Sequence, residues 1–445
     1  MTSERNGEKV KVGFISLGCN KNLVDTEKVI GLFKNNGYEI VNNQEEAEII
    51  VINTCGFIES AKQEAIDTIL EMAEYKKKKC KFLIVMGCLV QRYLTDLEKL
   101  IPEVDLYIKY SDYDKLWQKV EKLIKDEEIK EKINFDKIKD RVITTGNNYA
   151  YVKIADGCSN RCTYCAIPYI RGPLKSRDFE DIIEEVKELA EKGYKEIILT
   201  AQDTTKYGID IYGRPRLAEL LTEICKIEKI KWIRFLYAYP ETIDDELIKV
   251  VKENDKICKY FDIPIQHISD TVLKRMNRHS DGTSIRNLIN KLRQEIPEVV
   301  IRTTVMVGFP GETDRDFEEL YSFVKEAKFD KLGAFSYSKE EGTPAERLRD
   351  QVHGAAKKSR YNKIMKLQQG ISKENMQKKL NKEIEVMIEG STFNGEYYVG
   401  RSYMDAPEID GIVYIKTDKN LDSGEFVTVK VTEVEEYDLI AELCN

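Results

Sequence analysis

The sequence predicts an α/β protein with three successive regions: an N-terminal parallel α/β sheet domain, a central partial (βα)6 barrel, and a small C-terminal barrel made only of strands. Two observations lead to this fold class. Short apolar, β-branched runs alternate with helical patterns twice, first over 9–125 and again over about 149–337. After a long basic helical segment, the sequence pattern changes to short strands of alternating apolar and polar residues, which Gly and Asp interrupt.

The first block predicts a parallel sheet with helices on its faces. Strands that alternate with helices are typical of such a sheet. The charged, turn-rich stretch after it predicts a linker over 126–146, so we expect the first domain to occupy 9–125. The expected strands are VKVGFISL, AEIIVIN, KFLIVMG and VDLYIK, and the helical patterns cover 22–36, 57–76, 91–100 and about 112–125.

The second block has six expected strands: YAYVKIA, KEIILT, KWIRFL, KYFDIPI, EVVIRTTVMV and KLGAFSYS. Six βα units can curl into an open, partial barrel, whereas a closed barrel needs eight. The open side leaves room for a large substrate. We expect this domain over 147–376, with a basic helix over 355–381 at its end. The all-β module then occupies 377–445, with IEVMIEG, EYYVGRSY, GIVYIKT, EFVTVKVTEV and YDLIAEL as its strands.

Composition narrows the class of protein. No run of about 18 apolar residues occurs, and the start MTSERNGEKVKVGF has no apolar signal segment, so we expect a cytoplasmic protein that does not span a membrane. Ten cysteines in 445 residues are too few for a disulfide scaffold, and clustered cysteines of a cytosolic enzyme are more often metal ligands or catalytic groups. The net charge of −8 is uneven, because residues 382–445 hold fifteen Asp or Glu and five Lys or Arg.

The strongest chemical pattern is GCSNRCTYC, which places Cys158, Cys162 and Cys165 on one tight loop after the first strand of the second block. Thiolates are soft ligands suited to iron–sulfur clusters. Three ligands for four irons leave one iron open, and a substrate can chelate it there. The alternative is a zinc site or unrelated buried thiols, but structural zinc sites use four ligands and this loop offers three with no nearby His.

A second set of cysteines follows three strands of the first block, in the contexts SLGC, INTC and VMGC. Cys19, Cys55 and Cys88 are 36 and 33 residues apart, yet loops at the carboxyl ends of parallel strands converge on one crevice. Gly18 and Gly87 directly precede two of them and would let the backbone approach a bulky cluster. The alternative is three separate buried thiols. The cysteines that fit neither set are expected to be packing or surface residues: Cys80, Cys225, Cys258 and Cys444.

The CxxxCxxC pattern resembles that of the radical S-adenosylmethionine superfamily, and Tyr164 matches the aromatic position of the motif. In that superfamily the open iron binds S-adenosylmethionine, and one electron breaks its S–C5′ bond to give a 5′-deoxyadenosyl radical. SLGCNKNLVDTE, NTCGFIESAK and GCLVQRY, with this motif and a C-terminal TRAM-like barrel, further resemble the methylthiotransferases over 9–445. The resemblance implies two [4Fe–4S] clusters, the second on Cys19, Cys55 and Cys88 with an open iron that carries sulfur.

The resemblance also implies residues near the co-substrate S-adenosylmethionine. They lie in the loop motif, in TAQDTTKYG, PIQH and VGFPGET at strand ends, and within the strand EVVIRTTVMV. The alternative is that Gln202 and Arg302 are ordinary satisfied polar residues, and that His267 is a core histidine. The radical C–H step needs no general base, so we expect no catalytic residue beyond the six cysteine ligands. The expected cofactor-binding residues are Tyr164, Gln202, Asp203, Gln266, Arg302 and Gly311.

Two branches of this family differ in substrate. One modifies an adenosine of transfer RNA, and the other an aspartate β-carbon of the small-subunit ribosomal protein S-twelve. SLGCNKNLVDTE, NTCGFIESAK, YAYVKIADGCSNRCTYCAIPYIRGPLKSR and GRSYMDAPEIDG are similar to the second branch. A module that grips RNA should be basic, whereas this barrel carries a net charge of −10, which suits a basic ribosomal protein.

We therefore expect a methylthiotransferase that acts on the S-twelve protein, free or on the small ribosomal subunit, with a reducing electron donor and a sulfide source. The transfer-RNA enzyme is the alternative within the family, and a non-enzymatic RNA-binding protein with structural metal is the alternative from another class. The basic helix 355–381 could contact ribosomal RNA if the ribosome presents the substrate. DQVHGAAKKSRYN stands where the family has a more charged, proline-containing linker, which affects only the domain junction near 350.

Overall fold

The computed structural model describes residues 4–5, 8–126, 132–146 and 148–444. The chain divides into two compact units. Unit 1 comprises Met1–Thr144, Ala155–Arg177 and Ser338–Glu346, and unit 2 comprises Thr145–Ile154, Asp178–Tyr337 and Arg347–Asn445. Within the described ranges, no helix is long and apolar enough to cross a membrane.

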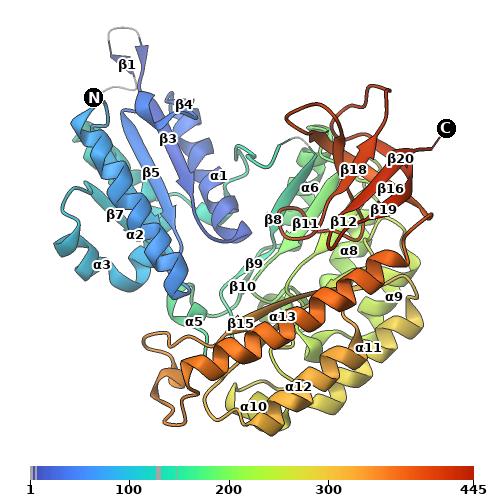
Figure 1. Ribbon diagram of the computed structural model, residues 1–445. Helices are drawn as coiled ribbons and strands as arrows, with labels where there is room; N and C mark the ends of the chain where they lie inside the picture. The colour runs from blue at the N-terminus through green and yellow to red at the C-terminus, as the bar shows by residue number, and fades with distance from the viewer. Residues whose placement is uncertain (1–3, 6–7, 127–131, 147, 445) are drawn as a thin grey trace. The chain divides into compact units, whose positions relative to one another are not determined.

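Unit 1 contains a five-stranded parallel sheet in the order β4-β3-β5-β6-β7 (Figure 1). The four strands expected from the sequence are present. β4 was not expected, because three residues in a polar stretch show no strand periodicity; it pairs at the sheet edge beside β3. The strands are β3 (Lys11–Ser16), β4 (Glu39–Val41), β5 (Ile49–Thr54), β6 (Phe82–Gly87) and β7 (Leu106–Lys109). A short antiparallel pair precedes them, β1 (Glu4–Arg5) and β2 (Glu8–Lys9).

Helices cover both faces of this sheet. Phe33 and Trp117 bring α1 and α4 against one face, where they meet strand residues such as Val51. Ile69 and Val90 bring α2 and α3 against the other face. Because both faces are buried, β5 has six buried residues in a row rather than an alternating pattern. The helices are α1 (Asn20–Asn35), α2 (Glu59–Ala73), α3 (Cys88–Leu100) and α4 (Leu116–Lys125), with 3-10 turns η1 (Gln44–Glu46), η2 (Glu74–Lys77) and η3 (Tyr110–Lys115).

The expected linker 126–146 packs along α1 where it is described, while 127–131 lie outside the described residues. Its 3-10 turn η4 (Phe135–Lys137) buries Phe135 in the sheet core. Lys28 donates to the carbonyl oxygen of Phe135 at 3.1 Å, and Arg141 pairs with Glu27 at 2.7 Å. Residues 132–146 are thus fastened to the first domain, and the domain boundaries themselves stay predictions.

Unit 1 also receives two segments from later in the chain. The first contains an antiparallel pair, β9 (Ala155–Asp156) with β10 (Lys175–Ser176), and the short helix α5 (Ile167–Ile170). The second is 338–346, which contains most of the 3-10 turn η7 (Pro344–Arg347). The loop of three cysteines, 157–165, therefore belongs to the same compact unit as the N-terminal sheet.

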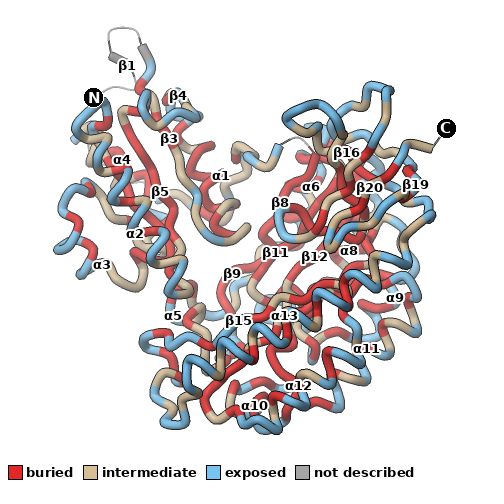
Figure 2. Tube along the Cα trace, viewed as in Figure 1, coloured by how far each residue is buried: buried red, intermediate tan, exposed pale blue. Residues whose placement is uncertain are grey.

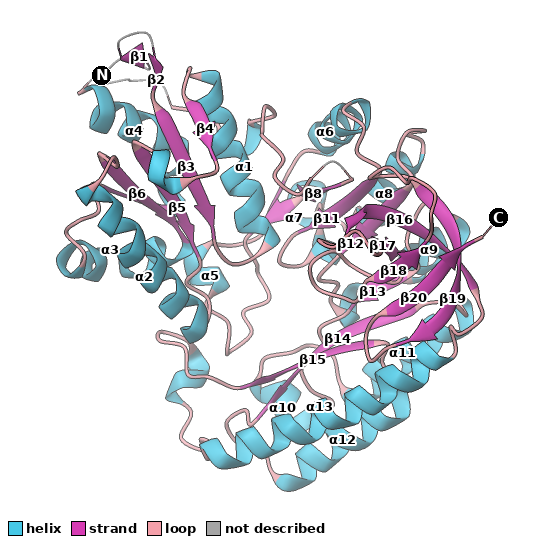
Figure 3. Cartoon of the chain, turned by 45° about the horizontal axis from the view of Figure 1, so that its top comes forward, coloured by secondary structure: helices cyan, strands magenta, loops and turns pink. Residues whose placement is uncertain are grey.

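Unit 2 contains six parallel strands in two three-stranded sheets, β8-β11-β12 and β13-β14-β15 (Figure 3). All six match expected strands, which confirms the six-unit βα region. The strands are β8 (Tyr149–Lys153), β11 (Glu196–Thr200), β12 (Trp232–Phe235), β13 (Tyr260–Asp262), β14 (Val300–Val307) and β15 (Lys331–Ser336). Between them lie α6 (Phe179–Glu191), η5 (Thr204–Lys206), α7 (Ile209–Tyr212), α8 (Leu217–Cys225), η6 (Pro240–Thr242), α9 (Asp245–Glu253), α10 (Asp270–Arg275), α11 (Gly282–Glu295) and α12 (Asp314–Ala327).

The expected basic helix is α13 (Gly354–Gln377), which packs along α12 and β15. Figure 2 shows buried and exposed residues alternating along α13, because one face of this helix packs against the rest of unit 2. The closed C-terminal barrel is also confirmed, with the strand order β16-β17-β18-β20-β19. Its strands are β16 (Glu383–Ser391), β17 (Tyr398–Ser402), β18 (Val413–Lys416), β19 (Phe426–Val434) and β20 (Leu439–Leu443).

Buried ion pairs dock the barrel on the amino ends of the unit 2 strands. Glu196, the first residue of β11, pairs with Arg234 and with Arg401 of β17 at 2.8 Å each. Asp405 pairs with Lys331, the first residue of β15, at 2.8 Å. The DAPEIDG stretch of the barrel, 405–411, therefore forms part of a structural interface. This docking leaves the carboxyl ends of the strands for ligands.

Candidate functional site

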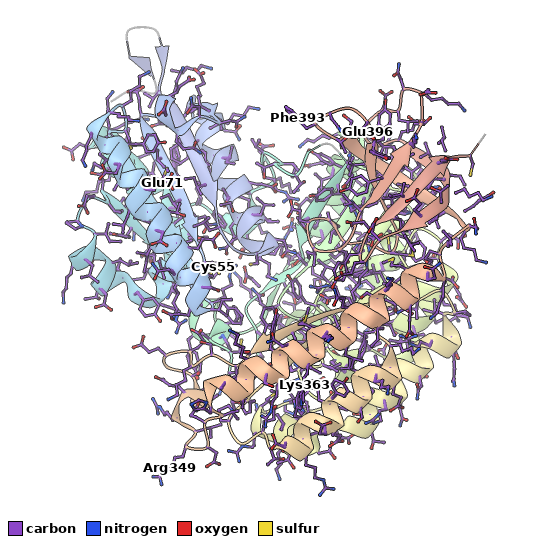
Figure 4. The ribbon with its side chains drawn as sticks, in the orientation of Figure 1. Cys55, Glu71, Arg349, Lys363, Phe393 and Glu396 are labelled. Carbon is purple, nitrogen blue, oxygen red and sulfur yellow. The ribbon has the colours of Figure 1, made fainter. Side chains whose placement is uncertain are left out.

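The first set of cysteines stands at the carboxyl ends of adjacent strands, and we call it the strand-end site: Cys19, Cys55 and Cys88. Cys19 is the N-cap residue of α1, and Cys88 is the first residue of α3, directly after β6. Cys55 follows β5, and Figure 4 labels it at that end of the sheet. Two of the three thiols thus lie at helix N-termini, where the helix dipole favours a thiolate.

Close backbone packing brings the three cysteine loops together. A Cβ on Gly18 would lie 2.7 Å from Cys55 Cβ and 3.0 Å from its Sγ. A Cβ on Gly56 would lie 2.9 Å from the carbonyl carbon of Cys88. Burial raises the pKa of the Cys88 thiol to about 11, and the nearby thiols of Cys19 and Cys55 contribute to that rise. The structure therefore brings together the three cysteines that the sequence placed in one crevice.

Gly87 makes the approach of β6 to β5 possible. Its φ is +107°, and a Cβ there would lie 2.3 Å from Asn53 Oδ1 and 2.6 Å from the carbonyl oxygen of Thr54. No side chain fits such a contact, and the positive φ independently favours glycine. Gly87 is therefore required where α3 starts at Cys88.

A buried polar network fastens the three strand ends, although no motif in the sequence marks it. Asn22 donates through Nδ2 to the carbonyl oxygens of Leu17 and Thr54, at 3.0 and 3.1 Å. Asn53 donates to the carbonyl oxygen of Asn22 at 2.9 Å, and Thr54 Oγ1 donates to that of Met86 at 2.7 Å. Asn22 lies in SLGCNKNLVDTE and Asn53 in INTC, so the available signal was their place beside the cysteines.

The second set, which we call the loop site, comprises Cys158, Cys162 and Cys165. Cys158 and Cys162 are buried and Cys165 is half-buried. Local backbone bonds shape the loop: Cys158 N donates to the carbonyl oxygen of Gly172 at 3.0 Å, and Cys165 N to that of Cys162 at 3.1 Å. Burial raises the pKa of the Cys165 thiol, and the thiols of Cys162 and Cys158 raise it further. The three thiols therefore lie close enough to interact.

The segment 338–346 contacts the backbone of the loop site directly and is linked to the backbone beside the strand-end site through Arg92. Arg92 donates to the carbonyl oxygen of Gly56 at 2.7 Å and to that of Glu341 at 2.8 Å. Ala345 N donates to the carbonyl oxygen of Thr163, between two loop-site cysteines, at 2.9 Å. This segment was not predicted to belong to either site, because no cysteine or strand end marks it in the sequence.

Both donor sets fit an iron–sulfur cluster. Each presents three thiols, the ligand type that iron–sulfur clusters take. Among the described residues, no group of three His, Cys, Asp or Glu side chains is arranged to hold a single metal ion. Structural zinc sites use four protein ligands, whereas each set here offers three. Of the remaining cysteines, Cys80 and Cys258 are buried and Cys225 and Cys444 half-buried, in keeping with packing roles.

Several expected cofactor-binding residues lie at carboxyl ends of strands in unit 2. Gln202 and Asp203 follow β11, and buried Asp203 accepts a hydrogen bond from Thr205 Oγ1 at 2.7 Å. Gln266 follows β13 with φ +67°, and its backbone bonds with Thr304 and Met306 in β14. A positive φ is costly for a side-chain-bearing residue and clusters at functional sites. Tyr237, after β12, has φ +63° and carries the same signal, which the sequence pattern did not reveal.

Arg302 and Gly311 have protein partners in the structure. Arg302, in the amino-terminal half of β14, pairs with Asp262 at 2.8 Å and with Asp410 at 3.8 Å. A Cβ on Gly311 would lie 2.4 Å from the guanidinium carbon of Arg275. The cofactor roles of these two residues and of Tyr164, in the loop site, stay predictions.

His267 behaves as a core histidine. Its Nδ1 accepts a hydrogen bond from the backbone N–H of Ser269 at 3.0 Å, and its side chain is fully buried. Burial lowers its pKa to about 3, so the imidazole is neutral at physiological pH. This agrees with the alternative that the sequence left open.

Three family models match the chain. They are the radical SAM superfamily over 152–324, the uncharacterized protein family UPF0004 over 11–109, and the TRAM domain over 382–444. Two similar relatives are named ribosomal protein uS12 methylthiotransferase RimO. The one from Alkaliphilus oremlandii is 62% identical over 98% of this chain and 99% of its own length. The one from Acetivibrio thermocellus is 52% identical over 98% of this chain and 99% of its own length.

Solved structures with a similar fold are more distant. The radical S-adenosylmethionine methyltransferase TsrM from Kitasatospora setae, with cobalamin and a [4Fe–4S] cluster bound, superposes with a TM-score of 0.55 at 12% identity, over 76% of this chain and 73% of that one. The cobalamin-dependent S-adenosylmethionine radical enzyme OxsB gives 0.51 at 12% identity, over 82% of this chain and 56% of that one. At these identities the likeness concerns the fold alone.

Proposed function

Because this chain belongs to the RimO family of ribosomal protein uS12 methylthiotransferases, within the radical SAM superfamily, we propose that it adds a methylthio group to the β-carbon of an aspartate in uS12, the S-twelve protein of the small subunit. The observation that carries the proposal is the presence of two separate thiol triads in one compact unit. A radical enzyme that only cleaves S-adenosylmethionine needs one such triad, whereas sulfur insertion needs a second.

The two triads have distinct roles in this proposal. Cys158, Cys162 and Cys165 would hold one [4Fe–4S] cluster, and the strand-end site would hold the other. When bound, the first cluster supplies an electron for the reductive cleavage of S-adenosylmethionine, and the second supplies sulfur. The chain's own contribution is to keep the two thiol sets apart, each with three ligands, so that one iron of each cluster stays open. A reducing electron donor, a sulfide source and a second S-adenosylmethionine, which donates the methyl group to the sulfur, complete the reaction.

Unit 2 would bind S-adenosylmethionine at the carboxyl ends of its strands, where Gln202, Asp203 and Gln266 lie. Asp203 is 1% exposed and held by Thr205, so its carboxylate has a fixed direction. The backbone of Gln266 is fixed to β14 in a strained conformation. Such preorganised polar groups suit a polar co-substrate whose reacting bond must be held in one orientation.

The barrel surface supports a basic protein as the substrate. Ten of its fifteen acidic residues are exposed, against four exposed basic ones, while Arg401 and Asp405 are buried in the docking interface. An acidic surface repels the phosphates of RNA and attracts a basic protein. The exposed acidic residues are Glu383, Glu385, Glu396, Glu408, Asp418, Asp422, Glu425, Glu433, Glu435 and Glu442.

Cluster content tests the two-triad assignment. After anaerobic reconstitution, we expect about two [4Fe–4S] clusters per chain. A variant with Cys158, Cys162 and Cys165 all changed to Ala should keep one cluster and make no 5′-deoxyadenosine. The matched variant with Cys19, Cys55 and Cys88 changed to Ala should also keep one cluster but still cleave S-adenosylmethionine. Cleavage by the first variant would contradict the assignment.

Mass spectrometry tests the substrate. In cells that lack this gene, the uS12 protein should lose the mass of its methylthio group, while the methylthio-adenosines of transfer RNA should be unchanged. Restoring the wild-type gene should restore the uS12 modification, and restoring the variant without the strand-end cysteines should not. Loss of the transfer-RNA modification with uS12 intact would instead favour the transfer-RNA branch.

A further inference from the structure

Arg171 is a buried cation in unit 1 that lies outside both cysteine motifs. It caps the short helix α5, six residues after Cys165, and its side chain is 1% exposed. Its guanidinium carbon lies 4.6 Å from the centre of the Tyr110 ring. An arginine keeps its charge even when buried, and burying it is costly unless each donor finds a partner. The partners of Arg171 therefore indicate why it is there.

One partner belongs to the loop site. Arg171 Nη1 donates to Asp156 Oδ2 at 2.6 Å. The other oxygen of Asp156 accepts the backbone N–H of Gly157 at 2.8 Å, and Gly157 directly precedes Cys158. A Cβ on Gly157 would lie 2.0 Å from the carbonyl oxygen of Pro173, so the backbone here cannot shift freely. Through Asp156, Arg171 is fixed to the start of the loop that carries the second thiol set.

The other partners belong to the strand-end site. Arg171 Nη2 donates to Asp25 Oδ2 at 3.1 Å and to Asn22 Oδ1, both on the first two turns of α1. The same Asn22 Oδ1 also accepts the Cys88 thiol, with the sulfur 3.7 Å away. Arg171 and the Cys88 thiol therefore share one acceptor, which places the cation one hydrogen-bonded group away from a ligand of the strand-end site.

A cation in this place favours the more negative state of a bound cluster. Reduction adds one electron to a cluster that already carries three thiolate ligands, so nearby positive charge stabilises the reduced form. Asp25 and Asp156 lie on the same guanidinium and oppose it. Removing the positive charge of Arg171 should therefore lower the reduction potential of the cluster. Removing the negative charge of Asp25 or Asp156 should raise it.

We propose that Arg171 is a positioning residue of the strand-end site: it sets the reduction potential of the cluster held by Cys19, Cys55 and Cys88, and it fixes that site to the Cys158 loop through Asp156. The proposal rests on the two-cluster assignment made above. It extends that assignment because a side chain that does not bind the cluster controls when the sulfur-bearing site accepts an electron.

The test uses the full-length chain in which Cys158, Cys162 and Cys165 are changed to Ala, so that the strand-end cluster is the one observed. Its midpoint potential is measured by a dye-mediated titration with electron paramagnetic resonance detection, alongside iron and sulfide content. Arg171→Gln should shift the reduction equilibrium about tenfold toward the oxidised state, which is about 59 mV for one electron. Arg171→Lys keeps the charge but not the fork of donors, so its shift toward the oxidised state should be smaller than that of Arg171→Gln.

Two further variants separate electrostatics from general damage. Asp25→Asn removes one opposing charge and should shift the equilibrium toward the reduced state. Arg141→Gln removes another buried arginine of unit 1, ion-paired to Glu27 on the same helix α1, and should leave the potential unchanged.

An unchanged potential in Arg171→Gln with full iron content would overturn the role. If Arg171→Gln does not retain iron, an unchanged potential in Asp25→Asn would overturn it equally. Failure of the parent variant to bind any cluster would overturn the two-cluster function itself, and with it this role. Opposite shifts in Arg171→Gln and Asp25→Asn, with Arg141→Gln unchanged, support it.

Discussion

The two thiol triads of unit 1 are assembled in opposite ways. Cys158, Cys162 and Cys165 lie within one stretch of eight residues, and backbone hydrogen bonds inside that stretch and to its neighbours shape it. Cys19 and Cys88 are 69 residues apart, and the strand-end triad exists only because β3, β5 and β6 are adjacent parallel strands. The loop site is a local motif, whereas the strand-end site is a product of the tertiary fold.

This difference determines what each site depends on. The strand-end site relies on buried side chains such as Asn22, which reaches the ends of two strands at once. The loop site relies on backbone geometry at Gly157 and Gly172. Damage to the sheet should therefore empty one site and leave the other, and damage to the loop should do the reverse.

Two glycine substitutions give the largest expected effects. Gly87→Ala places a Cβ against Asn53 and Thr54, and should cost the reconstituted protein about half of its iron and lower methylthio transfer about 100-fold. S-adenosylmethionine cleavage should persist, because the loop site is intact. Gly157→Ala places a Cβ against the carbonyl oxygen of Pro173 and should lose the other half of the iron, together with 5′-deoxyadenosine formation. Iron analysis and chromatography of the cleavage products measure both.

Gly193→Ala is the matched control. Gly193 has φ +99°, but nothing lies within 4 Å of the position of its Cβ. Its substitution carries the backbone strain without the clash, and should cost about 1 kcal/mol of stability with no loss of iron. If Gly87→Ala and Gly157→Ala each emptied both sites, the two triads would not be independent and the comparison would be wrong.

Asn22→Ala should have the second-largest effect. The side chain is fully buried, and its loss leaves the carbonyl oxygens of Leu17 and Thr54 without that donor. We expect the free energy of unfolding of the cluster-free protein to fall by about 3 kcal/mol, measured by anaerobic urea titration. Asn36→Ala, at the exposed end of the same helix, removes a bond to the carbonyl oxygen of Leu32 and should cost about 0.5 kcal/mol. Equal losses would show that the buried network does not stabilise the site.

The sequence was most informative where the signal is local or periodic. The six strands of unit 2 and the five of the barrel stand out as apolar runs, and the loop site as one motif. β4 was missed because three residues in a polar stretch show no periodicity. The strand-end triad was predictable because parallel strands end at one edge of the sheet. The fold class therefore implied that three cysteines far apart in the sequence lie close together.

The polar residues around the sites could not be predicted in the same way. The partners of Asn22 include Thr54, 32 residues away, and Arg171, 149 residues away, and no spacing rule connects such positions. Arg302 also has partners that no spacing rule connects: it pairs with Asp262 and with Asp410, the latter from the barrel. Side chains acquire such partners only when distant segments pack.

Ser159→Ala tests the loop site where the smallest effect is expected. Ser159 Oγ accepts the backbone N–H of Leu174 at 3.2 Å, a side-chain contact made by the loop itself. Ser159 is exposed, so water can replace the hydroxyl, and the loss of stability should stay below about 1 kcal/mol. Iron content should be unchanged and S-adenosylmethionine cleavage should stay within about twofold of the wild type, by the same chromatography. A loss of iron comparable to that of Gly157→Ala would mean that side chains hold the loop site as they hold the strand-end site, and the distinction between the two triads would fail.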